Sequence, residues 1–244
     1  MNSVKIAGLA FSLLFGGALS GMYFSRFLPT EHLIGVQMGI GLLTAMFALL
    51  LSLQLSAGKT YFDTQEQDVT LFASGTILLD SVLAHYGPEA REARETLRDS
   101  AADFLTRVWP KESSTASTWT PKDGIGIYDK IQKLSPKDDD QRSKRTVALG
   151  MVTDLSRRSW TTAARIRSST AVPLMIVEIA WATIIFVGFG LLAPLNAAAI
   201  VSLALCALAV ASGFFLIEEM NSPFSGLLKV SSAPIREALK YLAQ

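Results

Sequence analysis

The sequence predicts an all-α fold: four transmembrane helices in two hairpins, with a helical domain inserted between the second and third helix. The first observation behind this fold class is a set of four apolar stretches, at residues 6–24, 33–55, 171–193 and 197–217. Each has the roughly 20 residues with which a helix crosses a hydrocarbon core about 30 Å thick. The second is a charged middle segment, where residues 57–170 hold 17 of the 22 Lys and Arg and 16 of the 21 Asp and Glu. We therefore divide the chain into hairpin one (1–56), a water-facing helical domain (57–170), hairpin two (171–217) and a tail (218–244).

The first apolar stretch has two interpretations. Lys5 precedes an apolar run that reaches Ala18-Leu19-Ser20, an arrangement typical of a secretory signal with its cleavage site. The run continues through Phe24, which favours an uncleaved helix. Cleavage stays open as the alternative, and either outcome leaves the rest of the chain in the same orientation.

Glycines mark close contacts of the first two helices. Gly17 and Gly21 share one face of the first helix, as Gly35 and Gly39 do in the second. Small residues at this spacing let helix backbones approach closely in lipid. We expect them to pack within the first hairpin, and a subunit interface is the alternative.

One face of the second apolar stretch is small to polar. Steps of three or four residues place together Gln37, Gly41, Thr44, Ala48 and Ser52. Because polar groups at membrane depth usually face a cavity or another protein surface, this stripe predicts the lining of a water-filled path. Tight packing with local hydrogen bonds is the alternative. Phe47 lies on a neighbouring face and is a candidate apolar constriction, or else a packed residue.

The middle segment predicts helices and one loop. Residues 60–86 and 89–108 read as two helices separated by Gly87-Pro88, and the Ser, Thr, Pro and Gly of residues 111–126 predict a loop that contains Trp119. A long helix follows, which we expect Ser135 to cap. Asp138-Asp139-Asp140 suits the positive end of that helix and lacks the alternating ligands and the glycine of a calcium loop.

Glu178 is the exceptional residue of the third apolar stretch. It lies seven residues past Ala171, about two helical turns inside. A carboxyl group at membrane depth is costly and suggests a function. Three interpretations stay open: it attracts cations, it takes part in proton transfer, or it pairs with Arg165 or Arg167.

The tail has a distinct sequence pattern. The fourth helix runs into Glu218 and Glu219, Pro223 is expected to end it, Gly226 allows a tight turn, and Pro234 begins a short amphipathic helix. The whole segment reads Glu218-Glu219-Met220-Asn221-Ser222-Pro223-Phe224-Ser225-Gly226.

This segment resembles the bestrophin-like family of bacterial membrane proteins, which shows an acidic residue and then Pro-Phe-x-Gly after its last membrane helix. The resemblance also covers the two-plus-two order of apolar stretches and the stretch from Tyr61 to Leu97. It singles out Glu218, Glu219, Asn221, Pro223, Phe224 and Gly226 as the family's tail segment. More distantly, the segment is similar to the Asn-Pro-Phe-Gly of bestrophins, which are pentameric anion channels. Where animal bestrophins have a calcium-binding acidic cluster, this chain has Leu227-Leu228-Lys229, so we expect no metal site.

Charge near the apolar stretches predicts the orientation. With four spans, the N-terminus, the middle domain and the tail share one side of the membrane. That side carries Lys5, Lys59, Arg157, Arg158, Arg165, Arg167, Lys229 and Arg236, whereas the first hairpin has Arg26 and the second, Ala193-Pro194-Leu195-Asn196, has no Lys or Arg. By the positive-inside rule we expect a multi-pass protein of a bacterial inner (plasma) membrane with both termini and the middle domain cytoplasmic.

Composition argues against several functional classes. A net charge of +1 without a basic run gives no argument for nucleic acid as a partner. The single cysteine, Cys206, excludes an intrachain disulfide. His32 and His85 fall on different sides of the membrane, and the chain has no nucleophile elbow, phosphate loop or zinc spacing. We therefore expect neither an enzyme nor a cofactor.

Two functions remain. The first is a homo-oligomeric ion channel, with small anions favoured, in which Gln37, Thr44, Ala48 and Ser52 line the path. Small polar groups supply the weak binding that conduction needs, and the expected partners are the lipid bilayer, small inorganic ions and further copies of the chain. The alternative is a non-conducting, membrane-anchored interaction or regulatory protein that acts through its cytoplasmic helices.

Overall fold

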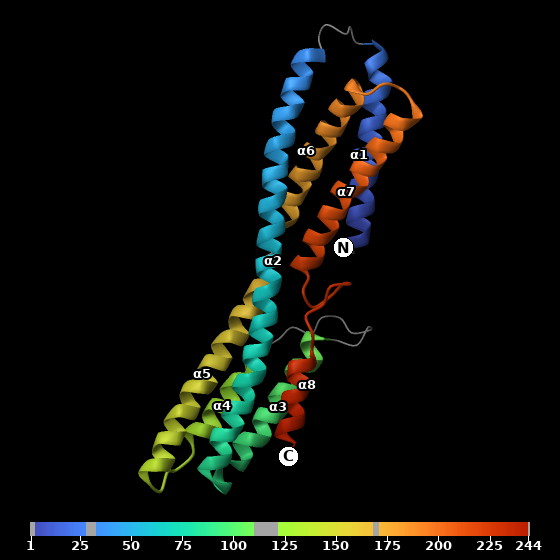
Figure 1. Cartoon of the computed structure of the whole chain (residues 1–244). Coiled ribbons are helices and arrows are strands. Elements are labelled where there is room, and N and C mark those ends of the chain that lie inside the picture. The colour runs from blue at the N-terminus through green and yellow to red at the C-terminus, as the bar shows by residue number, and fades with distance from the viewer. Residues whose placement is uncertain (1–2, 28–32, 110–121, 168–170, 244) are drawn as a thin grey trace. The chain divides into compact units, whose positions relative to one another are not determined.

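The computed structural model describes residues 3–27, 33–109, 122–167 and 171–243. Over these ranges the chain is helical and contains no strand. The elements follow the order α1 (Ser3–Phe24), the short 3-10 helix η1 (Ser25–Phe27), α2 (Leu33–Tyr86), the 3-10 helix η3 (Pro88–Ala90), α3 (Arg91–Val108), α4 (Lys122–Gln132), α5 (Asp139–Arg167), α6 (Ala171–Leu192), α7 (Ala197–Asn221) and α8 (Ala233–Leu242) (Figure 1). The all-α class is confirmed for the described residues.

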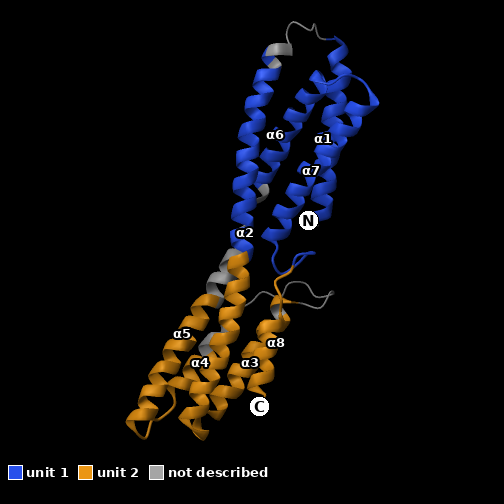
Figure 2. Cartoon of the chain, viewed as in Figure 1, with its two compact units in different colours: residues 1–62, 169–228 blue, residues 63–168, 229–244 orange. Residues whose placement is uncertain are grey.

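The helices pack into two compact units, coloured separately in Figure 2. Unit 1 comprises residues 1–62 and 169–228, and unit 2 comprises residues 63–168 and 229–244. The tail, which the sequence analysis treated as one segment, is therefore shared between the units. Our division at residues 56, 170 and 217 and the two hairpins stay predictions.

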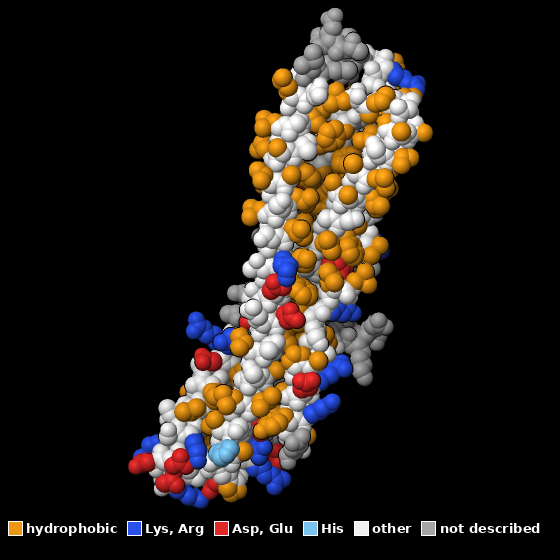
Figure 3. Space-filling view, in the orientation of Figure 1, with side chains coloured by type: hydrophobic (Ala, Val, Ile, Leu, Met, Phe, Trp, Pro, Cys, Tyr) orange, Lys and Arg blue, Asp and Glu red, His pale blue; other side chains and the backbone are white. Residues whose placement is uncertain are grey.

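Among the described residues, four helices are long and apolar enough to cross a membrane: Ser3–Phe27, Gln37–Tyr86, Pro173–Leu192 and Ala197–Asn221. Each of the four predicted stretches overlaps one of them. On the face that Figure 3 shows, hydrophobic side chains spread over unit 1, whereas Lys, Arg, Asp and Glu gather on unit 2. Large exposed side chains such as Leu42, Leu49 and Leu53 on α2 have no cover within the chain. Such a surface suits lipid rather than water.

α2 corrects one expectation. The sequence predicted a separate helix from residue 60, but α2 runs without interruption through 54 residues. A glycine inside a helix costs only about 1 kcal/mol relative to alanine, so Gly58 alone does not end it. The break comes at Gly87, whose φ of +128° lies in the region that favours glycine, and Pro88 opens η3. The predicted interruption at Gly87-Pro88 is confirmed.

α1 packs on α6 and α7 in unit 1, and glycines permit the closest approach. A Cβ atom on Gly21 would lie 2.1 Å from the carbonyl oxygen of Val187, and one on Gly190 would lie 2.0 Å from that of Ala18. The glycine face of the first helix therefore packs within the chain, but against α6 and not against the second helix as we expected. On α2, a Cβ atom added to Gly35 or Gly39 would meet no atom within 4 Å apart from its own helix backbone.

α2 also joins the core of unit 1. Its buried face contributes Ile40 and Phe47. The Phe47 ring centroid lies 6.4 Å from that of Phe214 on α7, and the Ile40 side chain fills the place where a Cβ atom on Gly188 of α6 would stand. One side of α2 is thus held by α6 and α7.

Unit 2 has its own core, built from α2, α3, α4, α5 and α8. The residues buried together are Leu79, Leu83, Tyr86, Ala90, Ala93, Leu97, Ile127, Ile131, Ala148, Val152, Leu155 and Leu242. A partly buried ion pair joins α2 to α3, in which the Arg94 guanidinium donates to both oxygens of Asp80 at 2.7 and 2.8 Å. Because Asp80 is 4% exposed, this pairing satisfies a charge that is costly to bury alone.

Two local predictions for this unit are wrong. Residues 122–126 of the predicted loop belong to α4; Trp119 and the rest of the loop up to residue 121 lie outside the described residues. The cap of the long helix is Asp138 rather than Ser135, because Asp138 Oδ1 accepts the backbone N–H of Gln141 at 2.7 Å. An Asp three residues before the bonded N–H is a preferred helix cap.

Candidate functional site

The small and polar stripe of α2 faces out of the chain. Gln37, Gly41, Ala48 and Ser52 are exposed, and Thr44 is half-buried. Only 11% of the most apolar part of α2 is buried, compared with 44% for α6. The structure therefore leaves this stripe without cover from the described helices.

The two hydroxyl groups of the stripe are bonded locally. Thr44 Oγ1 donates to the Ile40 carbonyl and Ser52 Oγ donates to the Ala48 carbonyl, both at 2.7 Å. Each hydroxyl oxygen keeps lone pairs with which to accept. These bonds fit the alternative of local hydrogen bonding.

Phe47 does not belong to this surface. It is 6% exposed and lies in the core against Phe214. Its position is that of the packed residue, which was one of the two interpretations of the sequence.

Glu178 is buried inside unit 1. The side chain is 2% exposed, and its Oε2 has no hydrogen-bond partner among the described residues. Its polar neighbour is Gln54 of α2, whose Nε2 is likewise buried without a partner. The side chains of Arg165 and Arg167, considered as partners from the sequence, lie outside those that the structure describes. Gln54 was not among the residues predicted from the sequence, although an amide at the end of an apolar stretch was a visible signal.

The family's tail segment is built around Glu219. This carboxylate, 1% exposed, accepts hydrogen bonds from the Ser3 hydroxyl and from the backbone N–H groups of Leu227 (2.6 Å) and Leu228 (2.9 Å). Gly226 makes the turn possible, since its φ is +107° and a Cβ atom there would lie 2.6 Å from Glu219 Oε2. We call Ser3, Glu219 and residues 226–228 the tail clasp.

The other tail residues surround the clasp. Glu218, Asn221 and Phe224 are half-buried and Pro223 is buried. α7 ends at Asn221, two residues before Pro223, and Pro234 lies in the first turn of α8. A pocket of about 350 Å³ opens beside the clasp, and clasp residues line it together with Glu218, Ser222 and Ser225. Across the described ranges no three His, Cys, Asp or Glu side chains are close enough to hold a metal ion.

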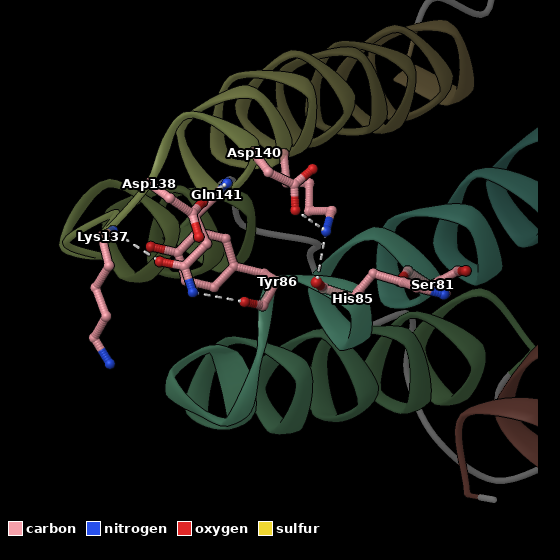
Figure 4. A network of polar contacts seen from close by, with 8 residues as sticks. Ser81, His85, Tyr86, Lys137, Asp138, Asp140 and Gln141 are labelled. Atoms are coloured by element: carbon pink, nitrogen blue, oxygen red, sulfur yellow. Dashed lines mark hydrogen bonds and ion pairs between the residues drawn. The ribbon is translucent and has the colours of Figure 1, made fainter.

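A polar network in unit 2 joins the end of α2 to the start of α5 (Figure 4). Gln141 donates from Nε2 to the Tyr86 carbonyl at 3.0 Å and accepts the backbone N–H of Lys137 at 2.8 Å. Lys144 donates to the His85 carbonyl and to Asp140. These bonds use the last carbonyls of α2, which have no partner within the helix. The network therefore ties the end of α2 to the start of α5.

Two ion pairs beside this network perturb their carboxyl groups. A hydrogen bond from Lys137 holds the pKa of Glu89 below its usual value, and the Glu89 carboxylate raises the pKa of Lys137. Lys130 lowers the pKa of Glu92 in the same way at 2.9 Å. All four side chains are at least a third exposed, so solvent screens the two pairs and each contributes little to stability.

The fold and the exposed apolar helices together define a helical protein with four candidate membrane spans in the part of the chain that the structure describes. The model of the bestrophin-like domain matches residues 12–235. The chain belongs to the bestrophin-like family. This membership supports the conclusion that the protein is a membrane protein and that its family is one of ion channels.

Solved structures share the fold over nearly the full chain. Two variants of a bacterial bestrophin homologue from Klebsiella pneumoniae superpose with TM-scores of 0.71 and 0.68 at 14% identity, covering 98% and 96% of this chain and 97% of theirs. A crystal structure described as a membrane protein covers 97% of this chain and 96% of its own at 13% identity, with a TM-score of 0.71. At these identities the likeness shows the fold alone. No curated protein matches this sequence.

Proposed function

We propose that the protein is a homo-oligomeric ion channel of the membrane, with the α2 stripe lining the path and small anions favoured. The observation that carries the proposal is the outward position of Gln37, Ala48 and Ser52. In a single chain these residues would face lipid, which gives no partner to an amide or hydroxyl group. If further copies of the chain surrounded a central water-filled path, the stripe would be shielded from lipid and would contact water.

Charge placement supports the preference for anions. The stripe itself carries no charged group. Glu178 is buried in the core rather than exposed beside the stripe, so its carboxyl group is not presented to a passing ion. Arg157 and Arg158 are exposed and would raise the local anion concentration. Rotation of the Thr44 and Ser52 hydroxyls would let them donate to an anion.

Planar-bilayer recording of the purified protein tests this function. We expect conductance above that of protein-free bilayers, and a reversal potential in a KCl gradient that lies near the chloride equilibrium potential. A potential near that of potassium would contradict the anion preference alone. Absence of conductance in the wild-type protein would contradict the channel.

Cysteine modification tests which face of α2 lines the path. In a Cys206→Ala background, Ser52→Cys should react with a charged methanethiosulfonate and lose conductance, because the reaction needs water. Leu53→Cys is the matched control, since Leu53 is the next residue and is 67% exposed on the apolar face. Equal reactivity of the two variants would exclude the stripe as the lining.

The second candidate function is a non-conducting interaction or regulatory protein. The observation that favours it is the local bonding of the Thr44 and Ser52 hydroxyls, which makes the stripe compatible with dry packing against another helix. In that case Ser52→Cys would form a disulfide between copies yet resist the charged reagent, and the wild-type protein would show no conductance. Neither candidate assigns a catalytic step.

A further inference from the structure

The contact between α2 and α6 changes character along its length. At one end it is apolar and close, because the Ile40 side chain occupies the space that a Cβ atom of Gly188 would need. At the other end two polar side chains meet, Gln54 from α2 and Glu178 from α6. The contact therefore has a fixed apolar end and a polar end.

The polar end is incompletely bonded. Glu178 Oε2 and Gln54 Nε2 are both buried and both lack a hydrogen-bond partner within the described ranges. Leaving such a group unsatisfied is costly because it has lost its hydrogen bonds to water, and exceptions of this kind call for an explanation. Closer approach of Gln54 to Glu178 would satisfy both groups at once.

The charged groups at this end of unit 1 are few. α1 carries Lys5, α2 carries Lys59, and α7 carries Glu218 and Glu219. Glu219 is bonded within the tail clasp. Among the described residues, the neighbour that interacts with the Glu178 side chain is the uncharged Gln54.

We propose that Glu178 and Gln54 form a proton-dependent contact that sets the position of α2 against α6. When Glu178 is protonated, its O–H donates to Gln54 Oε1 and the pair stays buried. When the proton leaves to water, the carboxylate accepts from Gln54 Nε2, but one amide does not offset the cost of a buried charge. Water then enters the polar end and the two helices separate there.

A displacement of α2 at Gln54 also moves the stripe, because Gln54 and the stripe residues lie on the same helix. Ser52 stands two residues before Gln54, about 3 Å along the helix axis. A shift of α2 at Gln54 therefore moves Ser52, while the Ile40–Gly188 contact holds the other end. Any effect of the Ser52 movement on conduction rests on the proposed channel function. The movement of α2 against α6 does not depend on that function.

Hydrogen exchange of the full-length protein in nanodiscs tests the movement directly. We expect peptides covering residues 50–58 to exchange several-fold faster at pH 8.5 than at pH 5.5, after correction for intrinsic rates. Glu178→Gln should remove this difference, because the amide keeps the shape but cannot ionise. The control Glu218→Gln alters a half-buried carboxyl group on α7 and should behave like the wild type.

Several outcomes would overturn the inference. The wild-type segment exchanging equally at both pH values would do so without any variant, and so would a pH response that survives in Glu178→Gln. If Glu178→Gln does not assemble, Glu178→Asp provides the second test, and a wild-type-like pH response is expected because it still titrates. Absence of wild-type conductance at any pH would count against the proposed channel, while hydrogen exchange would still decide this contact.

Discussion

Glu219 shows how one side chain organises the tail. Its carboxylate is almost fully buried although it stands in the last turn of α7. Burying a carboxylate is costly unless hydrogen bonds replace its water, and the tail clasp supplies donors from α1 and from the turn after Gly226. The acidic residue and the glycine of the family's tail pattern therefore act as one unit.

Removing the Glu219 carboxylate should release the turn. In Glu219→Ala the N–H groups of Leu227 and Leu228 lose their acceptor, and we expect a loss of about 1–3 kcal/mol of stability. Hydrogen exchange at residues 227 and 228 should become fast, and thermal unfolding in detergent should occur at a lower temperature. Gly226→Ala should have a similar effect because its Cβ atom would meet Glu219 Oε2. Wild-type exchange in either variant would contradict the clasp, and Glu218→Ala is the control.

The ion pairs of Glu89 and Glu92 predict a pH dependence at the surface of unit 2. Both carboxyl groups have a pKa in the folded protein below the ordinary value. A lowered pKa contributes stability that is present above the unfolded-state pKa and is lost as the pH falls through the folded-state pKa. Denaturant unfolding should therefore show stability falling below about pH 4.3, the ordinary Glu value. The double variant Glu89→Gln, Glu92→Gln should show a smaller fall than the control Asp129→Asn.

At the scale of elements, the close packing of α1 against α6 requires glycine, which has no side chain, where the two helices cross. A Cβ atom on Gly190 would lie 2.0 Å from the Ala18 carbonyl oxygen, which belongs to a helix backbone and cannot move away alone. Gly190→Ala should therefore force the helices apart and cost about 1–3 kcal/mol or more. Gly16→Ala is the control, because nothing lies within 4 Å of its Cβ position and alanine favours a helix. Thermal unfolding of both variants measures the difference, and equal stabilities would contradict the close crossing.

The start of α5 provides a second test at this scale. Asp138→Ala removes the acceptor of the Gln141 N–H and should cost about 1 kcal/mol, the usual value of a helix cap. Ser135→Ala, which changes the cap that the sequence suggested first, should leave stability unchanged. Hydrogen exchange of residues 139–142 locates the effect. A larger loss in Ser135→Ala than in Asp138→Ala would contradict the assigned cap.

Periodicity and length predicted the elements well, whereas partners distant in sequence could not be predicted. The apolar stretches lie in α1, α2, α6 and α7 because about 20 apolar residues have few alternatives to a membrane helix. The contact of Ser3 with Glu219 spans 216 positions, and no local pattern encodes such a pairing. The predicted partner of the Gly17–Gly21 face was wrong for the same reason. Glycine spacing shows that a helix packs closely, but it does not show which helix it packs against.

For the candidate site, the stripe was visible in the sequence because helical spacing alone places Gln37 and Ser52 on one face. The exposure of the stripe could not be predicted from the sequence, because it depends on which side of α2 packs against α6 and α7. Phe47 illustrates this: it neighbours the stripe in sequence, yet it lies against Phe214. Whether the stripe lines a path stays a prediction.

At the scale of the whole molecule, the distribution of charge determines how the chain should lie in a bilayer. Of the four candidate spans found among the described residues, unit 1 contains three whole and residues 37–62 of the fourth, Gln37–Tyr86. The charged middle of the chain falls mainly in unit 2. The connection between α6 and α7 has no Lys or Arg, whereas Lys229, Arg236 and Lys240 follow α7. Because cytoplasmic segments are enriched in Lys and Arg, both termini and unit 2 should be cytoplasmic.

Thiol labelling in intact bacterial cells tests this orientation. In a Cys206→Ala background, Leu195→Cys places a thiol in the connection between α6 and α7, where Leu195 is 56% exposed. A membrane-impermeant maleimide should label it from outside, once outer barriers are made permeable. Tyr241→Cys, on α8 where Tyr241 is 50% exposed, should react only after the inner membrane is opened. The two sites have similar exposure, so a difference in labelling reports the side of the membrane rather than burial. Labelling of Tyr241→Cys in cells with an intact inner membrane would reverse the orientation and place the arginine-rich middle of the chain outside.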